Sequence, residues 1–266
     1  MMEAYRGIDF KTIRAWVEGD IAYMQFYRPK AMNAVNTKLL DESYELTMMY
    51  QEDPQVKAII VCGTEHAFAA GADISEMTTY TPFQAQEFIN KVSRNFIAVE
   101  EHTKPILAAV RGLALGGGFE FALACDIAIF AEDAVLGLPE IRLGIFPGGG
   151  GTQRLPRATS TNIAKQYIFT GDFMNPAEAY RLGIANKVVP AAEVLETTEK
   201  FARKMARKSP LALRAAKQAI NASRDTDIKT GCRLEQISWS MLFSSEDQKE
   251  GMQAFLENRR AEFKGK

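Results

Sequence analysis

The stretch RGLALGGGFEFALACD, residues 111–126, places three consecutive glycines inside an apolar run and follows them closely with a glutamate, Glu120. Glycine weakens the interior of a helix or a strand, and a carboxylate in apolar surroundings is costly unless it is paired or neutralised. Two unfavourable choices side by side are typical of a functional site. We therefore expect a glycine-rich turn that carries a working carboxylate here.

The segments around this stretch indicate the fold class. Short apolar runs predict strands over residues 21–27, 57–63, 105–112 and 126–131. Residues 37–51 have the pattern of a helix between the first two of them. Strands separated by helices imply an α/β architecture with a mostly parallel sheet, in which binding sites gather at strand-to-helix turns.

The chain changes character after about Val189, where strand signals stop. Residues 191–208, 210–223 and 227–263 have helical patterns, which predicts a separate helical layer. Apolar residues recur there at helical spacing, either as intramolecular core or as an oligomer contact: Leu234, Ile237, Met241, Leu242, Met252, Phe255 and Leu256.

Composition excludes several classes of function. The 266 residues are 47% hydrophobic and 24% charged, which is ordinary for a globular protein. With 32 Lys and Arg against 33 Asp and Glu, the net charge of −1 gives no global field to recruit nucleic acid or an anionic membrane. No segment is apolar for long enough to span a bilayer.

Histidines and cysteines give no sign of a metal site or of disulfides. The two histidines, His66 and His102, are far apart and fit surface or loop positions rather than a metal spacing. The three cysteines, Cys62, Cys125 and Cys232, are isolated and odd in number, so we expect reduced thiols that pack in the core. With a start that lacks the features of a secretory or transit peptide, this predicts a cytoplasmic protein.

Two glycine-rich turns, residues 63–74 and 113–126, each follow a strand and lead toward a helix. Backbone N–H groups are exposed where such a turn opens a helix, and two of these turns together can form an oxyanion hole. The simpler interpretation is close packing of helix and strand. Neither turn has the Gly-Lys-Ser/Thr ending of a phosphate-binding loop or the spacing of a dinucleotide fingerprint.

Two glutamates lie in apolar surroundings. Glu120 follows the glycines between Phe119 and Phe121, and Glu140 follows Pro139 among leucines and isoleucines. Taken singly, Glu120 fits a helix-dipole interaction and Glu140 an ion pair with Arg142. Together with the glycine turns they suggest acid–base chemistry, because apolar surroundings raise the pKa of a carboxyl group toward neutrality.

Four ordered segments are similar to motifs of the crotonase superfamily, and specifically of its enoyl-CoA hydratases. They are AFAAGADI (67–74), GLALGGGFEFALACDI (112–127), LPEIRLGIFPGGGGTQRLPR (138–157) and FTGDFMNPAEAYRLGIANKVV (169–189). The resemblance extends from RPKAMNAVN (28–36) to the terminal FLENRRAEFKGK. It implies a spiral of ββα units with an acyl-CoA site over residues 1–190. It also implies a helical region over residues 191–266 that forms homotrimers or dimers of trimers.

The resemblance also implies roles for individual residues. The backbone N–H groups of Ala72 and Gly117 form the oxyanion hole for the thioester carbonyl. Glu120 and Glu140 hold one water between them, with Glu120 activating it and Glu140 supplying the proton that reaches C2. Positions similar to those that bind CoA are Lys30, Ala70, Asp73, Ile74, Phe263 and Lys264. The last two sometimes act from a neighbouring subunit, although Lys30 and Lys264 fit equally well as solvated surface charges.

Because both acidic positions are kept, the expected reaction is reversible hydration of a short-chain trans-2-enoyl-CoA such as crotonyl-CoA, without a metal or an organic cofactor. The alternatives are an acyl-CoA double-bond isomerase or a dehydratase of a branched or cyclic acyl-CoA. RNA binding is disfavoured because residues 81–104 mix basic and acidic side chains, and both glutamates argue against a silent acyl-CoA binder. We expect residues 77–96 to shape the substrate pocket and Phe119 to affect chain-length preference.

Overall fold

The larger of two sheets has six strands in the order β1-β2-β3-β5-β7-β10 in the computed structural model, which describes residues 5–266. Their bounds are Ile13–Glu18 (β1), Ile21–Phe26 (β2), Ala58–Cys62 (β3), Ile106–Val110 (β5), Ile127–Ala131 (β7) and Lys187–Val189 (β10). Among the described strands of this sheet, β1 and β2 pair antiparallel and the other neighbours pair parallel. The four predicted strands are β2, β3, β5 and β7, and β3 and β5 are buried throughout, as expected for parallel strands covered on both faces.

A smaller sheet holds short strands in the order β4-β6-β8-β9. They are Ala67–Ala69 (β4), Leu113–Leu115 (β6), Val135–Gly137 (β8) and Phe173–Met174 (β9). Three times the chain passes from a strand of the large sheet to one of the small sheet and then to a helix. This repeat is the spiral of ββα units that the resemblance to the crotonase superfamily implies.

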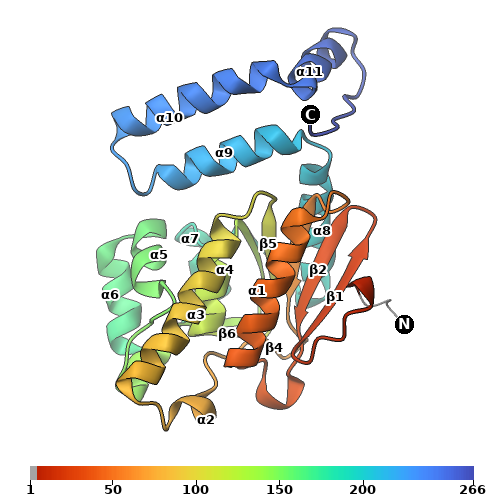
Figure 1. Cartoon of the computed structure of the whole chain (residues 1–266). Helices are drawn as coiled ribbons and strands as arrows, with labels where there is room; N and C mark the ends of the chain where they lie inside the picture. Colours follow the sequence, from red (N-terminus) through yellow and green to blue (C-terminus); the bar gives the residue numbers. More distant parts are fainter. Residues whose placement is uncertain (1–4) are drawn as a thin grey trace.

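Helices cover both faces of the large sheet. α1 and α3 pack against each other, and α8 packs against β3, β5 and β7 (Figure 1). The helices of the body are α1 (Thr37–Glu52), α2 (Ile74–Met77), α3 (Pro82–Glu100), α4 (Gly117–Ala124), α5 (Gly151–Ala158), α6 (Thr161–Thr170), α7 (Pro176–Arg181) and α8 (Val194–Ala206). Short 3₁₀ turns are η1 (Tyr5–Gly7), η2 (Pro29–Ala31), η3 (Pro139–Leu143), η4 (Ala191–Glu193) and η5 (Leu242–Ser244).

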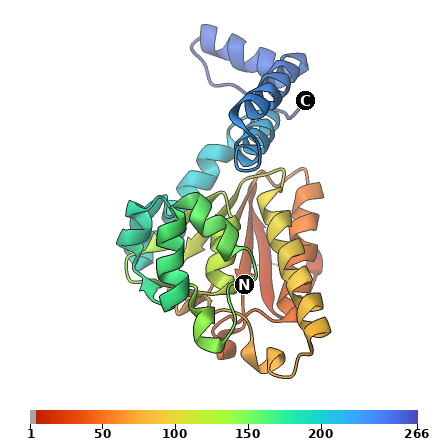
Figure 2. The same cartoon turned by 90° about the vertical axis from the view of Figure 1, so that its left-hand side faces the viewer.

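Three further helices form an arm that projects from the body, drawn in blue in Figures 1 and 2. They are α9 (Pro210–Ala222), α10 (Ile228–Met241) and α11 (Glu246–Leu256). The single helical stretch predicted over residues 227–263 is therefore divided into α10 and α11, and it ends at Leu256 rather than at residue 263. Ser245 caps α11 through the N–H of Gln248, and the tail folds back, with the N–H groups of Lys264 and Gly265 donating to Asp247.

Two further expectations concern membranes and cysteines. Within residues 5–266 no helix has the length and apolar character needed to cross a membrane. All three cysteines are free, and Cys62 is buried. Cys232 lies exposed on α10, so the expectation of core packing is wrong for this residue, because α10 stands away from the body.

Candidate active site

Two strand-to-helix turns meet at a cavity of about 800 Å³. β4 leads through Gly71 toward α2, and β6 leads through Gly116 into α4. Both glycines have positive φ, +108° and +48°, which side chains rarely tolerate. Because β4 and β6 pair side by side, the turns that follow them are neighbours, and both Ala72 and Gly117 line the cavity.

The backbone N–H groups of Ala72 and Gly117 are free of the secondary structure around them. Gly117 is the first residue of α4, and the N–H groups of a first helical turn have no intrahelical partner. The bridge between Val35 and Ala72 uses the N–H groups of Val35 and Asp73, so that of Ala72 takes no part in it. The geometry is compatible with the predicted oxyanion hole.

Glu120 is placed in the first turn of α4 and is buried. Its neighbour Phe121 anchors the helix in the core by packing edge-on against Phe26 and Phe96. The N–H of Gly151 donates to Glu120 Oε1 at 2.7 Å. Burial raises the pKa of Glu120 to about 7, against the hydrogen bond from Gly151, which favours the charged form.

Glu140 reaches the same place from η3. Its Oε1 lies so close to Gly116 that a Cβ on this glycine would be 2.8 Å away. Its Oε2 is buried and has no hydrogen-bond partner among the described residues, and burial raises the pKa of Glu140. The ion pair with Arg142 does not form, because Arg142 turns toward Asp172, at 3.9 Å, and the ring of Phe173.

The remaining wall of the cavity is mostly apolar, with Gln86 and Arg142 as its polar members. Residues of the predicted segment 77–96 line it, namely Met77, Tyr80, Phe88, Ile89, Val92 and Phe96. A second wall, which the sequence did not indicate, comes from Leu143, Ile145, Phe146 and Phe173. Phe119 is not part of the cavity lining: its ring is buried and packs near that of Phe130, so any effect on chain-length preference would have to be indirect.

The predicted CoA-binding residues fall into three groups. Ala70 and Ile74 line the cavity. Asp73 precedes α2 and forms an ion pair with Arg28 at 2.9 Å, and Lys30 lies exposed on η2. Phe263 and Lys264 belong to the tail beside α11, so within one chain they are not brought to the cavity.

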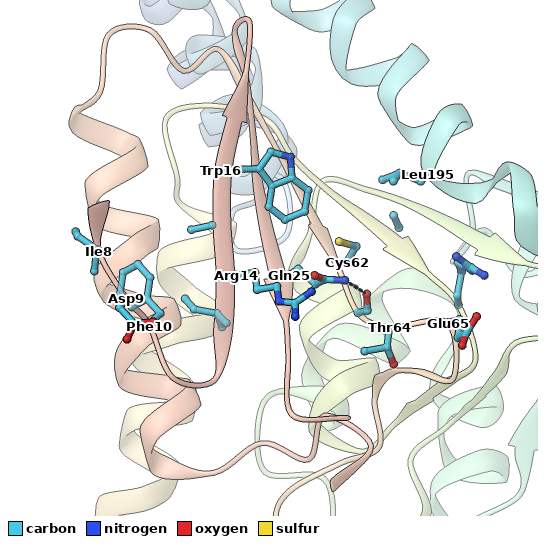
Figure 3. A pocket seen from close by; sticks show the side chains of 15 residues that line it. Ile8, Asp9, Phe10, Arg14, Trp16, Gln25, Cys62, Thr64, Glu65 and Leu195 are labelled. Carbon is cyan, nitrogen blue, oxygen red and sulfur yellow. Dashed lines mark hydrogen bonds between the residues drawn. The ribbon is translucent and has the colours of Figure 1, made fainter. Parts of the chain in front are cut away.

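A second hollow, of about 700 Å³, lies against β1, β2 and the end of β3 (Figure 3). Arg14, Trp16 and Cys62 point into it, and Gln25 donates to the carbonyl of Gly63 at 2.9 Å. It contains none of the predicted site residues. Its two carboxylates, Asp9 and Glu65, are solvated, with side chains 84% and 68% exposed, so it has no buried carboxylate like Glu120 of the first cavity.

Comparison with known proteins agrees with this geometry. Residues 17–266 match the family described as enoyl-CoA hydratase/isomerase. The chain is 43% identical over 247 residues to a crotonyl-CoA hydratase of Syntrophomonas wolfei, covering 92% of this chain and 95% of the relative. It is 42% identical over 246 residues to a short-chain-enoyl-CoA hydratase of Clostridium acetobutylicum, covering 92% and 94%.

Solved structures show the same fold. A crystal structure of enoyl-CoA hydratase from Bacillus anthracis superposes with a TM-score of 0.93 at 35% identity, covering 96% of this chain and 100% of the other. One from Geobacillus kaustophilus gives 0.92 at 39% identity, covering 97% and 99%. The crotonase fold predicted from the sequence is confirmed, and the chain belongs to the enoyl-CoA hydratase/isomerase family.

Proposed function

We propose that the protein adds water reversibly across the C2=C3 double bond of a short-chain trans-2-enoyl-CoA to give a 3-hydroxyacyl-CoA. The observation that carries this is that the buried Glu120 and the partly buried Glu140 share a cavity with the backbone N–H groups of Ala72 and Gly117, for which the described residues offer no partner. Relatives at 42–43% identity named crotonyl-CoA hydratase and short-chain-enoyl-CoA hydratase support the reaction and the chain length.

In this proposal the N–H groups of Ala72 and Gly117 donate hydrogen bonds to the thioester carbonyl oxygen. Donation strengthens as the carbonyl becomes enolate-like, and one such donor is worth about 3 kcal/mol to the transition state. These hydrogen bonds draw electron density from C3 toward the carbonyl oxygen, so C3 becomes electrophilic and is attacked by water. Backbone donors polarise the carbonyl and the two carboxyl groups transfer the protons, so the proposal includes no metal and no organic cofactor.

The two glutamates divide the proton transfers. Glu120 takes a proton from water as its oxygen bonds to C3, and Glu140 gives a proton to C2. Their settings favour this order, because Glu120 accepts a hydrogen bond that stabilises its charged form whereas the buried Oε2 of Glu140 accepts none from the described residues. Dehydration uses the same groups in reverse.

CoA binding is assigned to the rim of the cavity. Ala70 and Ile74 line it directly, and Lys30 and Asp73 stand on the turns beside them. Phe263 and Lys264 are proposed to reach the CoA of a neighbouring copy, because in their own chain they lie on the arm.

We further propose that the arm forms a homotrimer or a dimer of trimers. Large apolar side chains stand exposed on it: Ile228, Trp239 and Met241 on α10, and Phe255 and Leu256 on α11, all at least 62% exposed. Such a surface is typical of an oligomer contact. Light scattering should give a mass of three or six chains, and a Trp239→Glu/Phe255→Glu variant should dissociate. A monomeric wild type would contradict the proposal.

A cytoplasmic location completes the proposal and rests on the three free cysteines, which suit a reducing compartment.

The function is tested by following the loss of enoyl-thioester absorbance when the protein is mixed with crotonyl-CoA. Rapid loss is expected for the wild type, with a product heavier by one water. Glu140→Gln should fold and bind the thioester but lose most turnover, a fall of about 10²- to 10⁴-fold. A change of absorbance without added mass would instead indicate an isomerase.

A further inference from the structure

The carboxylate of Glu120 depends on a loop that contributes no side chain to it. Gly151 donates its N–H to Oε1, and the N–H of Gly149 also favours the charged form. A Cβ at Gly149 would be 2.7 Å from Glu120 Oε2, so this loop fits tightly around the carboxylate. Glycine is the most permissive residue in backbone conformation, so a glycine loop holds its position only if something else fixes it.

Arg154 of α5 is the group that fixes this loop. Its Nη1 donates to the carbonyl oxygen of Gly149 at 3.0 Å, and its Nη2 donates to Glu100 Oε2 at 2.7 Å. The side chain is only 12% exposed and does not line the cavity. Partly buried arginine–carboxylate hydrogen bonds of this kind have a more defined geometry than solvated surface pairs.

We propose that Arg154 is a positioning residue for Glu120, which holds the loop of residues 149–151 against the anchored carboxylate of Glu100. The proposal rests on the hydratase function proposed above. Arg154 touches neither substrate nor reacting atoms, and it acts through the backbone of Gly149.

Glu100 ties this arrangement to the helical arm. It lies at the end of α3, and its Oε1 accepts from Arg224 at 2.7 Å while its carbonyl accepts from Asn221 of α9 at 2.9 Å. One carboxylate is therefore shared by Arg154, which holds the loop, and by the first helical hairpin of the arm. The packing of α9 on the body thereby helps to fix the atoms around Glu120.

The positive charge of Arg154 has a second effect. The charged groups that face Glu120 are Glu140 from η3, which raises its pKa, and Arg154 from α5, which lowers it. From α3 the side chains at this place are Val92 and Phe96, which are uncharged. Removing the Arg154 charge should therefore raise the pKa of Glu120 further, and less of it would be ionised at neutral pH.

The test compares Arg154→Gln, Arg154→Lys and Arg157→Gln in crotonyl-CoA hydration over a range of pH. Arg157 is the matched control, because it lies on the same helix but is solvent-exposed, and within residues 5–266 its side chain donates hydrogen bonds to Gln153 alone. For Arg154→Gln we expect kcat to fall about 10²-fold, the effect of a small misplacement of a catalytic group, with KM nearly unchanged. In the plot of its hydration rate against pH, the rise on the acidic side (the low-pH limb) should move to higher pH.

Arg154→Lys keeps the charge but not both hydrogen bonds, so its low-pH limb should stay near that of the wild type while kcat falls. Arg157→Gln should match the wild type in both. If the wild type hydrates crotonyl-CoA and Arg154→Gln keeps its kcat and its pH profile, the positioning role is wrong. If Arg154→Gln does not fold, Arg154→Lys decides by the same criterion on kcat. A wild type without hydration would overturn the proposed function instead.

Discussion

Two glycine clusters open two helices beside Glu120, and they use their backbone in different ways. Residues 116–118 lead into α4 and place the N–H of Gly117 at the cavity. Residues 148–151 lead into α5, and the N–H of Gly151 donates to Glu120 Oε1. The first cluster faces the place of the substrate, whereas the second holds a side chain of the protein itself.

The space around each glycine shows why both clusters are needed. A Cβ at Gly117 would meet no heavy atom of the described chain within 4 Å, but one at Gly118 would be 2.1 Å from the carbonyl oxygen of Ala69. At Gly151 a Cβ would be 3.0 Å from Glu120 Oε1. The first cluster therefore uses glycine for a sharp turn and close strand packing, and the second uses it to admit a carboxylate.

Among the substitutions in the two glycine clusters, Gly117→Pro should lower the rate of hydration most. Proline is tolerated at the first position of a helix, so the change removes the N–H donor with little loss of helix. We expect kcat for crotonyl-CoA hydration to fall by about 10²- to 10³-fold, as for loss of one oxyanion-hole donor. Steady-state kinetics measure it, and circular dichroism shows whether the variant is folded.

Gly117→Ala is the matched control for this change, because it keeps the N–H and its methyl group enters open space. Its kcat should be far closer to the wild type. A folded Gly117→Pro variant with normal activity would refute the role of this N–H.

Gly151→Ala tests the second cluster and should have a smaller effect. The added Cβ would press against Glu120 Oε1, Leu138 and Pro147 at 2.9–3.0 Å, which displaces the carboxylate or the loop. We expect kcat to fall by roughly 10- to 100-fold, because small misplacements of a catalytic group are costly. In Gly148→Ala the Cβ meets only the end of the Ile89 side chain, so this control should lose less. Equal losses would mean that the contact with Glu120 is unimportant.

The sequence predicts the long buried strands of the fold and misses the short ones. β2, β3, β5 and β7 are apolar runs of five or six residues, so the pattern identifies them. The small sheet consists of strands of two or three residues, which are too short to have a period. β1 was also not predicted, although Ile13, Ala15 and Val17 alternate with Arg14, Trp16 and Glu18, which is the pattern of a half-buried strand.

The same distinction between local and long-range signals applies to the site. Glu120 and Glu140 stand out because each breaks a local rule within a few residues. The bond from Gly151 to Glu120 joins residues 31 positions apart, and that from Arg154 to Glu100 joins residues 54 apart. The glycine run 148–151 was visible in the sequence, but only the packing of α5 beside α4 shows what it holds.

The smallest expected difference between the two clusters is a shift in the pH dependence of hydration. Below the pKa of the catalytic base, the rate should fall about tenfold for each pH unit. Glu120 must be ionised to take a proton from water, so kcat/KM should rise with pH up to an apparent pKa of about 7. The hydrogen bond from Gly151 stabilises the ionised form, so weakening it in Gly151→Ala should raise the pKa and move this limb to higher pH. Gly117 makes no such bond to Glu120, so Gly117→Ala should leave the limb where it is. A limb that does not differ among the three proteins would mean that Glu120 is not the group that must lose a proton.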